Sequence, residues 1–223
     1  MRRRTLLLSA LAGATVCALP RFASAAMPVA LPGETAIRRF SVLYKGDRIG
    51  AHLVSFSAAT GQTRVTTEID LVVKAFFFTV FAYSHRSEEI WRDGELVSLN
   101  SETTDHGKTY QVMGAATDHG FRVVNEGGPS VAPAATLTSN SLWTPAILEQ
   151  KALVDAQFGG IIGVAARKFR DEQLVIAGQN VHAARYRFIM PYLAGSIWYD
   201  DAGLWVHSEF ERDGVQIVYQ LDM

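Results

Sequence analysis

Short turn sequences recur along most of the chain, and they limit the folds that it can adopt. Clear examples are Lys45-Gly46-Asp47, Arg92-Asp93-Gly94-Glu95 and Arg212-Asp213-Gly214. The segments between the turns are rich in β-branched and aromatic residues, and residues 65–73 alternate apolar and polar side chains, as a strand with one buried face does. Strands joined by turns of two to four residues must run antiparallel. The turns therefore predict one long antiparallel meander.

We predict an all-β fold with minor α structure, containing about eleven or twelve strands by this pattern. A long loop over residues 125–140 interrupts the meander. Thr144-Pro145 then predicts the start of one short amphipathic helix, which ends before Gly159-Gly160. A flat sheet of this width would expose an apolar face, so we expect it to curl into a half-open barrel around the helix.

The first 25 residues have the composition of a signal peptide. Arginines at positions 2–4 precede an apolar run over residues 6–19, and Ala23-Ser24-Ala25 has the small-x-small pattern of a cleavage site. We expect cleavage after Ala25 and export to the periplasm. The motif that begins at Arg3 resembles the twin-arginine export signal, which leaves that route open beside general secretion.

Removal of residues 1–25 leaves one domain. Residues 26–33 contain two prolines and predict a flexible leader, and residues 34–223 predict a single curled antiparallel sheet. Four arginines leave with the signal peptide, so 17 of the 21 Lys and Arg remain beside 22 Asp and Glu. The net charge of the mature chain is therefore −5. This balance disfavours nucleic-acid binding. The single cysteine, Cys17, also leaves, so we expect neither a disulfide nor a catalytic thiolate.

The segment from Leu71 to Trp91 is the most apolar and aromatic part of the mature chain. A membrane-spanning helix needs about 20 apolar residues, more than this segment offers, and its β-branched and aromatic residues favour one long strand or two bent ones. From Tyr83 onward, alternate residues share one face of a strand. They are Tyr83, His85, Ser87, Glu89 and Trp91. This row marks either the mouth of a pocket or, more simply, a strand that leaves the core for solvent.

No sequence motif identifies a reaction. The chain lacks a Gly-x-Ser-x-Gly elbow, a Ser-x-x-Lys motif and a glycine-rich phosphate loop. Two Thr-Asp-His-Gly sequences, residues 104–107 and 117–120, predict turns at opposite sheet edges rather than a shared metal site. His52, His85 and His207 lack metal-binding spacing, although strands can bring such residues to one face. We therefore expect no enzyme activity, metal or cofactor.

Several motifs together resemble a known family. They are Ile49-Gly50-x-His52, Tyr83-x-His85 with the later Trp91, Ala184-Arg185-Tyr186 and Trp198-Tyr199-Asp200. Over nearly all the mature chain they are similar to an exported bacterial family that is catalogued as a domain of unknown function. More distantly, the layout resembles the outer-membrane lipoprotein carrier fold, in which a curled antiparallel sheet holds acyl chains. That resemblance implies a role in binding an apolar ligand.

A hydrophobic, lipid-like ligand is therefore the expected partner, held in a cavity of the curled sheet. The predicted cavity wall consists of Phe76, Phe78, Phe81, Tyr83, His85, Trp91, Trp143 and Trp198. His85 or Glu89 would orient a polar head group. The same aromatic residues can instead form plain core, in which case an envelope-integrity or assembly factor that acts by protein–protein contact is the alternative. A hydrolase or metal-dependent enzyme is the third hypothesis.

Overall fold

The computed structural model describes residues 29–32, 35–212 and 214–222, so the predicted signal peptide lies outside the described residues. The described chain is built almost entirely from strands. They are β1 (Ala36–Tyr44), β2 (Asp47–Ala59), β3 (Gln62–Ala75), β4 (Phe78–Arg92), β5 (Glu95–Asp105), β6 (Lys108–Thr117), β7 (Gly120–Asn125), β8 (Gly128–Ala132), β9 (Ala152–Val154), β10 (Ile161–Gly163), β11 (Ala165–Ile176), β12 (Gln179–Met190), β13 (Leu193–Asp200), β14 (Trp205–Arg212) and β15 (Val215–Asp222). Two short 3₁₀-helices, η1 (Ser141–Trp143) and η2 (Pro145–Glu149), complete it.

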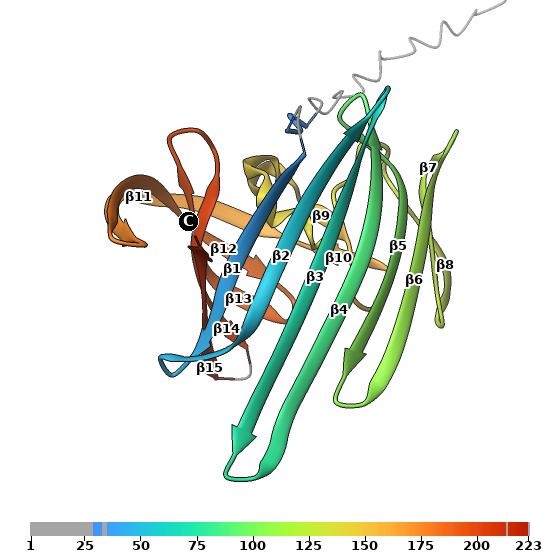
Figure 1. Ribbon diagram of the computed structural model, residues 1–223. Coiled ribbons are helices and arrows are strands. Elements are labelled where there is room, and N and C mark those ends of the chain that lie inside the picture. The colour runs from blue at the N-terminus through green and yellow to red at the C-terminus, as the bar shows by residue number, and fades with distance from the viewer. Residues whose placement is uncertain (1–28, 33–34, 213, 223) are drawn as a thin grey trace, which may run out of the picture.

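One antiparallel sheet of 13 strands curls into a half-open barrel (Figure 1). Its order is β11-β12-β13-β14-β15-β1-β2-β3-β4-β5-β6-β7-β8, so β8 and β11 form the two edges. The last strand, β15, pairs with β1 in the middle of the sheet, with Phe40 opposite Leu221. The predicted all-β, half-open antiparallel barrel is confirmed.

Local turn chemistry explains the meander. Hairpins turn at Lys45-Gly46, Asp93-Gly94, His106-Gly107 and Ala177-Gly178, and both residues of each pair have positive φ. A two-residue turn with this geometry matches the twist of the flanking strands and favours glycine at its second position. Successive turns therefore lie at opposite ends of the half-barrel.

The chain between β8 and β10 fills part of the concave side of the sheet, and we call residues 133–160 the inner segment (Figure 1). Its apolar side chains are buried in the main core, among them Leu137, Ile147, Leu153 and Val154. The backbone N–H of Val154 donates to Leu137 O at 2.9 Å, which ties two stretches of the segment together.

The predicted helix within the inner segment is much shorter than expected. Thr144 caps it as anticipated, because its Oγ1 accepts from the N–H of Ala146, and Pro145 is the first helical residue. The helix is a five-residue 3₁₀-helix that ends at Glu149. The prediction of an amphipathic helix up to Gly159 is wrong, because β9 pairs with β10 and its backbone groups are engaged there.

The segment Leu71–Trp91 forms a hairpin, not one long strand or two bent ones. Ala75 pairs with Phe78, so Phe76 and Phe77 form a two-residue turn between β3 and β4. The alternate residues from Tyr83 to Trp91 do share one face, but all of them are buried. The simpler interpretation of this row, a strand that leaves the core, is therefore wrong, because the inner segment covers that face.

The described part of the predicted leader, residues 29–32, lies against the sheet. Val29 is buried, and its N–H donates to Gly94 O at 3.1 Å. Leu31 packs against the main core.

The core consists of two separate clusters of buried apolar residues, a large one and a small one. We call the end with the β2–β3 and β4–β5 turns the closed end. There, Trp143 of the inner segment packs edge-on against Phe56 at 5.2 Å and Trp91 at 5.5 Å between ring centroids. We call the end with the β1–β2, β3–β4 and β5–β6 turns the open end. A separate small apolar cluster lies there, formed by Val42, Ile69, Leu71 and Tyr83.

Candidate functional site

The candidate site is a cavity of about 70 Å³ at the open end, between the sheet and the inner segment. Most of its wall is apolar, and the wall residues come from seven strands and the inner segment. The apolar wall includes Ile69, Leu71, Phe81, Leu142, Met190 and Phe210. Polar groups reach it from His52, Tyr83 and Asn140. The cavity thus combines an apolar surface with a few polar atoms, which is the usual composition of a small-molecule site.

His52 of β2 is the polar group that stands out in this wall. The side chain is only 2% exposed, and its Nε2 atom has no hydrogen-bond partner among the described residues. Three aromatic rings surround it: Phe40, Trp205 and Tyr219, at 5.4–6.0 Å between centroids. Burial, and to a smaller extent the nearby His85, lowers the pKa of His52 from 6.5 to about 3. His52 is therefore neutral at pH 7 and offers an unused ring nitrogen to the cavity.

A buried polar row begins at Asn140 and leads from the cavity into the core. The Asn140 amide donates to His85 Nε2 at 3.0 Å and to Ser87 Oγ at 2.8 Å. Because an amide nitrogen only donates, His85 Nε2 accepts, and His85 Nδ1–H then donates to Thr103 Oγ1 at 2.7 Å. Burial lowers the pKa of His85 to about 4, which agrees with this neutral tautomer. Both ring nitrogens of His85 are therefore engaged.

Glu89 ends this row deeper in the core. Its carboxyl group accepts from Thr138 Oγ1 at 2.6 Å and from Trp91 Nε1 at 2.9 Å. Burial raises the pKa of Glu89 to about 7, and the two hydrogen bonds oppose this shift. Since Thr138 and Asn140 belong to the inner segment, the row fastens that segment to β4.

A family model for a domain of unknown function, DUF6134, matches residues 40–222. The chain belongs to the DUF6134 family. This confirms the predicted resemblance to a family of unknown function. No curated protein matches the chain. A similar solved structure is the crystal structure of a beta-barrel-like protein of the domain of unknown function DUF1849 from Brucella abortus. It has a TM-score of 0.61 and 9% identity, and the match covers 86% of this chain and 98% of that one, which shows a shared fold.

The cavity of this DUF6134 protein contains two of the eight predicted wall residues, Phe81 and Tyr83. His85 lies next to the cavity, behind Asn140. Trp91 and Trp143 are buried in the closed end. Their prediction as wall of this cavity is wrong, because Trp143 of the inner segment packs directly against Trp91 and fills the space there. The proposed role of Glu89 in orienting a head group is also wrong, because both carboxyl oxygens are held by Thr138 and Trp91.

Phe76 and Phe78 lie outside the cavity altogether. Their side chains are 97% and 75% exposed at the β3–β4 turn. Their prediction as wall residues is wrong because the aromatic run contains the turn itself, and the sequence there has no Asn-Gly or Asp-Gly to reveal it.

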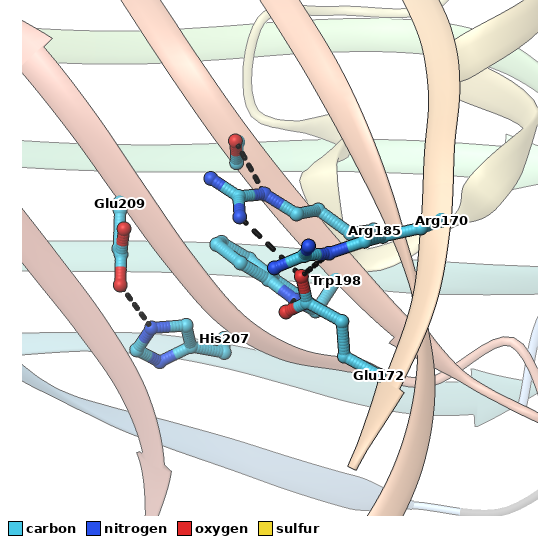
Figure 2. Close-up of polar contacts among 7 residues, drawn as sticks. Arg170, Glu172, Arg185, Trp198, His207 and Glu209 are labelled. Carbon is cyan, nitrogen blue, oxygen red and sulfur yellow. Dashed lines mark hydrogen bonds and ion pairs between the residues drawn. The ribbon is translucent and has the colours of Figure 1, made fainter. Parts of the chain in front are cut away.

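Trp198 of β13 lies on the outer face of the sheet (Figure 2). The neighbouring Tyr199 donates to Leu142 O at 2.9 Å and therefore faces the inner segment, so Trp198 must face outward. Its indole N–H donates to Glu172 at 3.0 Å, and the Arg185 guanidinium lies over its ring at 4.7 Å. Its prediction as a cavity residue is wrong because one residue of offset along a strand changes the face.

The same cluster also separates the three strand histidines. His207 packs against Trp198 at 4.9 Å between ring centroids and lies near Glu209, on the same face as Trp198 (Figure 2). His52, by contrast, lines the cavity, and His85 contacts Asn140 of the inner segment. Within the described ranges, no group of three His, Cys, Asp or Glu residues is placed to hold a metal ion. Neither 3₁₀-helix has the length and composition to cross a bilayer.

Sequence reasoning missed His52, Ile69 and Leu71 as wall residues. A signal was present, because His52 shares strand parity with Val54 and Phe56, and all three are buried. The strand pattern thus placed His52 on the inner face.

A larger open groove of about 940 Å³ lies at the closed end between residues 29–32, η2 and the β13–β14 turn. It is a surface feature formed by loops, so the smaller buried cavity is the better candidate.

Proposed function

We propose that the protein is a non-enzymatic binding or carrier protein for a hydrophobic, lipid-like ligand in the periplasm. The observation that carries this proposal is the apolar cavity at the open end, with the unpartnered Nε2 of His52 in its wall. The signal peptide of the sequence supports the compartment. The apolar wall supports the class of ligand, because burial of apolar surface is the main source of affinity in such sites.

The size of the cavity limits what part of a ligand it takes. Its 70 Å³ exceeds the roughly 10–15 Å³ that holds one water molecule but is below the roughly 300–1,000 Å³ of sites that enclose a whole drug-sized ligand. A ligand therefore places one apolar end in the cavity. The remainder lies along the inner face of β3 and β4 beyond it, where Val73 and Phe81 are partly exposed.

His52 supplies the polar contact. A buried donor or acceptor without a partner costs about 1–3 kcal/mol, and a ligand hydroxyl, carbonyl or carboxyl group that reaches Nε2 removes this cost. The ligand that fits best is therefore apolar with a single polar group. The rest of the interior supports a binding function rather than catalysis, since His85 and Glu89 are saturated by Thr103, Asn140, Thr138 and Trp91.

The test is native mass spectrometry, with organic extraction, of protein purified from the periplasm in mild buffer. Leu71→Trp fills the cavity, and Val175→Trp, on the 66% exposed Val175 of β11, is the matched control. A stoichiometric lipid adduct on the wild type and on V175W, but not on L71W, supports the proposal. A bare protein mass after incubation with envelope lipids overturns it.

A further inference from the structure

The end of the β3–β4 hairpin projects beyond the rest of the sheet, and we call residues 72–82 the ribbon (Figure 1). The last pair between β2 and β3 is Gly50 with Leu71, and the last pair between β4 and β5 is Tyr83 with Asp105. Beyond these pairs, the strands of the ribbon pair with each other, and one further bond, from His106 N–H to Ala82 O at 3.4 Å, joins the base of the ribbon to the β5–β6 turn. Four residues of β3 thus extend past the sheet, roughly 13 Å at the rise of an antiparallel strand.

The ribbon carries the largest concentration of exposed apolar side chains in the described chain. Phe76, Phe77 and Phe78 are 97%, 98% and 75% exposed, and Val80 and Val72 are 56% and 42% exposed. Phe76 and Phe77 form the turn itself, and the other three lie on the two strands that lead to it. In the folded protein they contact almost nothing, so the stability of the isolated chain does not explain them.

The turn at the tip also differs from the other hairpin turns. Phe76 has a φ of 55°, in the left-handed region where a bulky side chain is rare. Asp93 and His106 have a similar φ at the same turn position, but glycine follows each of them, whereas Phe77 follows Phe76. Turn geometry therefore does not explain the two aromatic residues, and a contact outside the molecule would explain them.

Positive charge surrounds the ribbon. The ribbon and the turns on either side of it, β1–β2 and β5–β6, contain four cations, Lys45, Arg48, Lys74 and Lys108. The same segments contain two acids, Asp47 and Asp105. The whole chain, by contrast, has a net charge of −1. The open end is therefore locally basic on an acidic protein and suits an anionic surface.

We propose that the ribbon tip inserts into the interface of a phospholipid bilayer with anionic headgroups. Phe76, Phe77 and Phe78 would enter the acyl boundary, and Lys74 would reach the phosphates. The narrow tip projects past the neighbouring turns, so it reaches a flat surface before the rest of the sheet does (Figure 1). Aromatic residues beside lysine and arginine are the composition of interfacial anchors.

The backbone sets the depth of insertion. The outer edges of the ribbon have N–H and C=O groups that no neighbouring strand pairs, and these cannot enter hydrocarbon. Only the turn and its first residue pair therefore enter, roughly the 5–10 Å typical of interfacial segments. In this orientation the cavity mouth faces the membrane. The docking itself requires no ligand and does not depend on the proposed function.

The first test is flotation of the mature protein, residues 26–223, with phosphatidylcholine vesicles, with and without phosphatidylglycerol. Wild type is expected to bind the anionic vesicles, less strongly at high salt. Phe76→Ser/Phe77→Ser is expected to weaken binding at least roughly tenfold, from the apolar surface lost. The matched control, Val175→Ser/Ile189→Ser, removes two exposed apolar side chains from β11 and β12 and is expected to bind as wild type. Equal binding by all three proteins, or none by wild type, overturns the proposal.

A label reports where the tip lies. The mature protein lacks Cys17 and so has no cysteine, which allows Phe77→Cys to carry an environment-sensitive fluorophore at the tip and Thr60→Cys to carry it at the closed end. A blue shift with vesicles at position 77 alone supports insertion. If instead the serine variants abolish self-association of wild type in sedimentation without vesicles, the tip is a contact between copies and the proposal is wrong. Leu71→Trp separates membrane insertion from the proposed ligand binding. It blocks the cavity and leaves the ribbon surface unchanged, so it should lose the lipid adduct and still bind vesicles.

Discussion

The closed and open ends of the half-barrel are built from the same strands but differ in packing. At the closed end, Trp143 of the inner segment fills the space between Phe56 and Trp91, and all three are at most 2% exposed. At the open end, the sheet surrounds a cavity and a histidine nitrogen without a partner. The strands thus provide the curved wall, and the inner segment decides which end is solid.

The turns differ at one position. Glycine is the second turn residue in Thr60-Gly61 and Asp93-Gly94 of the closed end, and also in Lys45-Gly46 and His106-Gly107 of the open end. The Phe76-Phe77 turn on the projecting ribbon has no glycine and exposes both aromatic side chains. This aromatic turn therefore distinguishes the open end from the closed end.

The largest expected effect is the difference between Trp91→Ala and Phe81→Ala in the loss of unfolding free energy. Trp91 is fully buried and donates to Glu89, so its truncation is expected to cost about 3–5 kcal/mol. Phe81 borders an existing cavity and is partly exposed, so its truncation is expected to cost about 1 kcal/mol. Urea unfolding measures both. Similar losses would show that the two ends are equally packed.

The second effect concerns pH. Because the pKa of Glu89 rises from 4.5 unfolded to about 7 folded, the folded state binds its proton more tightly. The stability that protonated Glu89 adds to the free energy of unfolding, up to about 3 kcal/mol, is present below pH 4.5 and is lost as the pH rises through 7. Glu89→Gln is expected to flatten this loss in urea unfolding from pH 5 to 8. Glu88→Gln, on the exposed face beside Arg64, should keep the wild-type profile; a flattened profile there would contradict the assignment.

The third effect tests the unpartnered histidine. His52→Leu removes a buried polar atom and is expected to raise the free energy of unfolding by about 1–3 kcal/mol at pH 7. The folded pKa of His52 is about 3, so the stability that depends on its neutral form is fully present above pH 6.5. This part of the free energy of unfolding is lost as the pH falls toward 3. The variant should therefore resist acid better. His119→Leu, at an exposed turn, is the control. Destabilisation by His52→Leu would show that His52 has a structural partner.

The smallest effect tests the two kinds of turn. Phe76→Gly relieves the left-handed strain and is expected to stabilise the protein by up to about 1 kcal/mol. At the closed end, Gly94→Ala places a side chain at a φ of 78° and is expected to destabilise by a similar amount. Thermal unfolding measures both shifts. A loss of stability with Phe76→Gly would mean that the aromatic tip contributes to the fold itself.

The candidate site was only partly predictable. Alternation placed Tyr83 and Phe81 on the inner face, where they line the cavity. Trp198 and Tyr199 follow Ile197 in an apolar run, so the sequence pattern does not show which of them faces inward. The hydrogen bond from Tyr199 to Leu142 decides this, and Leu142 is distant in sequence.

The sequence by itself determined most of the strands and turns and the antiparallel meander, because turn geometry and period-two alternation are local properties. It missed β8, which lies in the predicted loop, and β9, which lies in the predicted helix. The pairing of β15 with β1 and the position of the inner segment were decided only by the tertiary structure. Both depend on contacts between residues far apart in the chain, and no local pattern encodes them. The cavity exists because the inner segment fills one end of the curled sheet and leaves the other end incompletely filled. Amino-acid composition does not reveal this difference in packing.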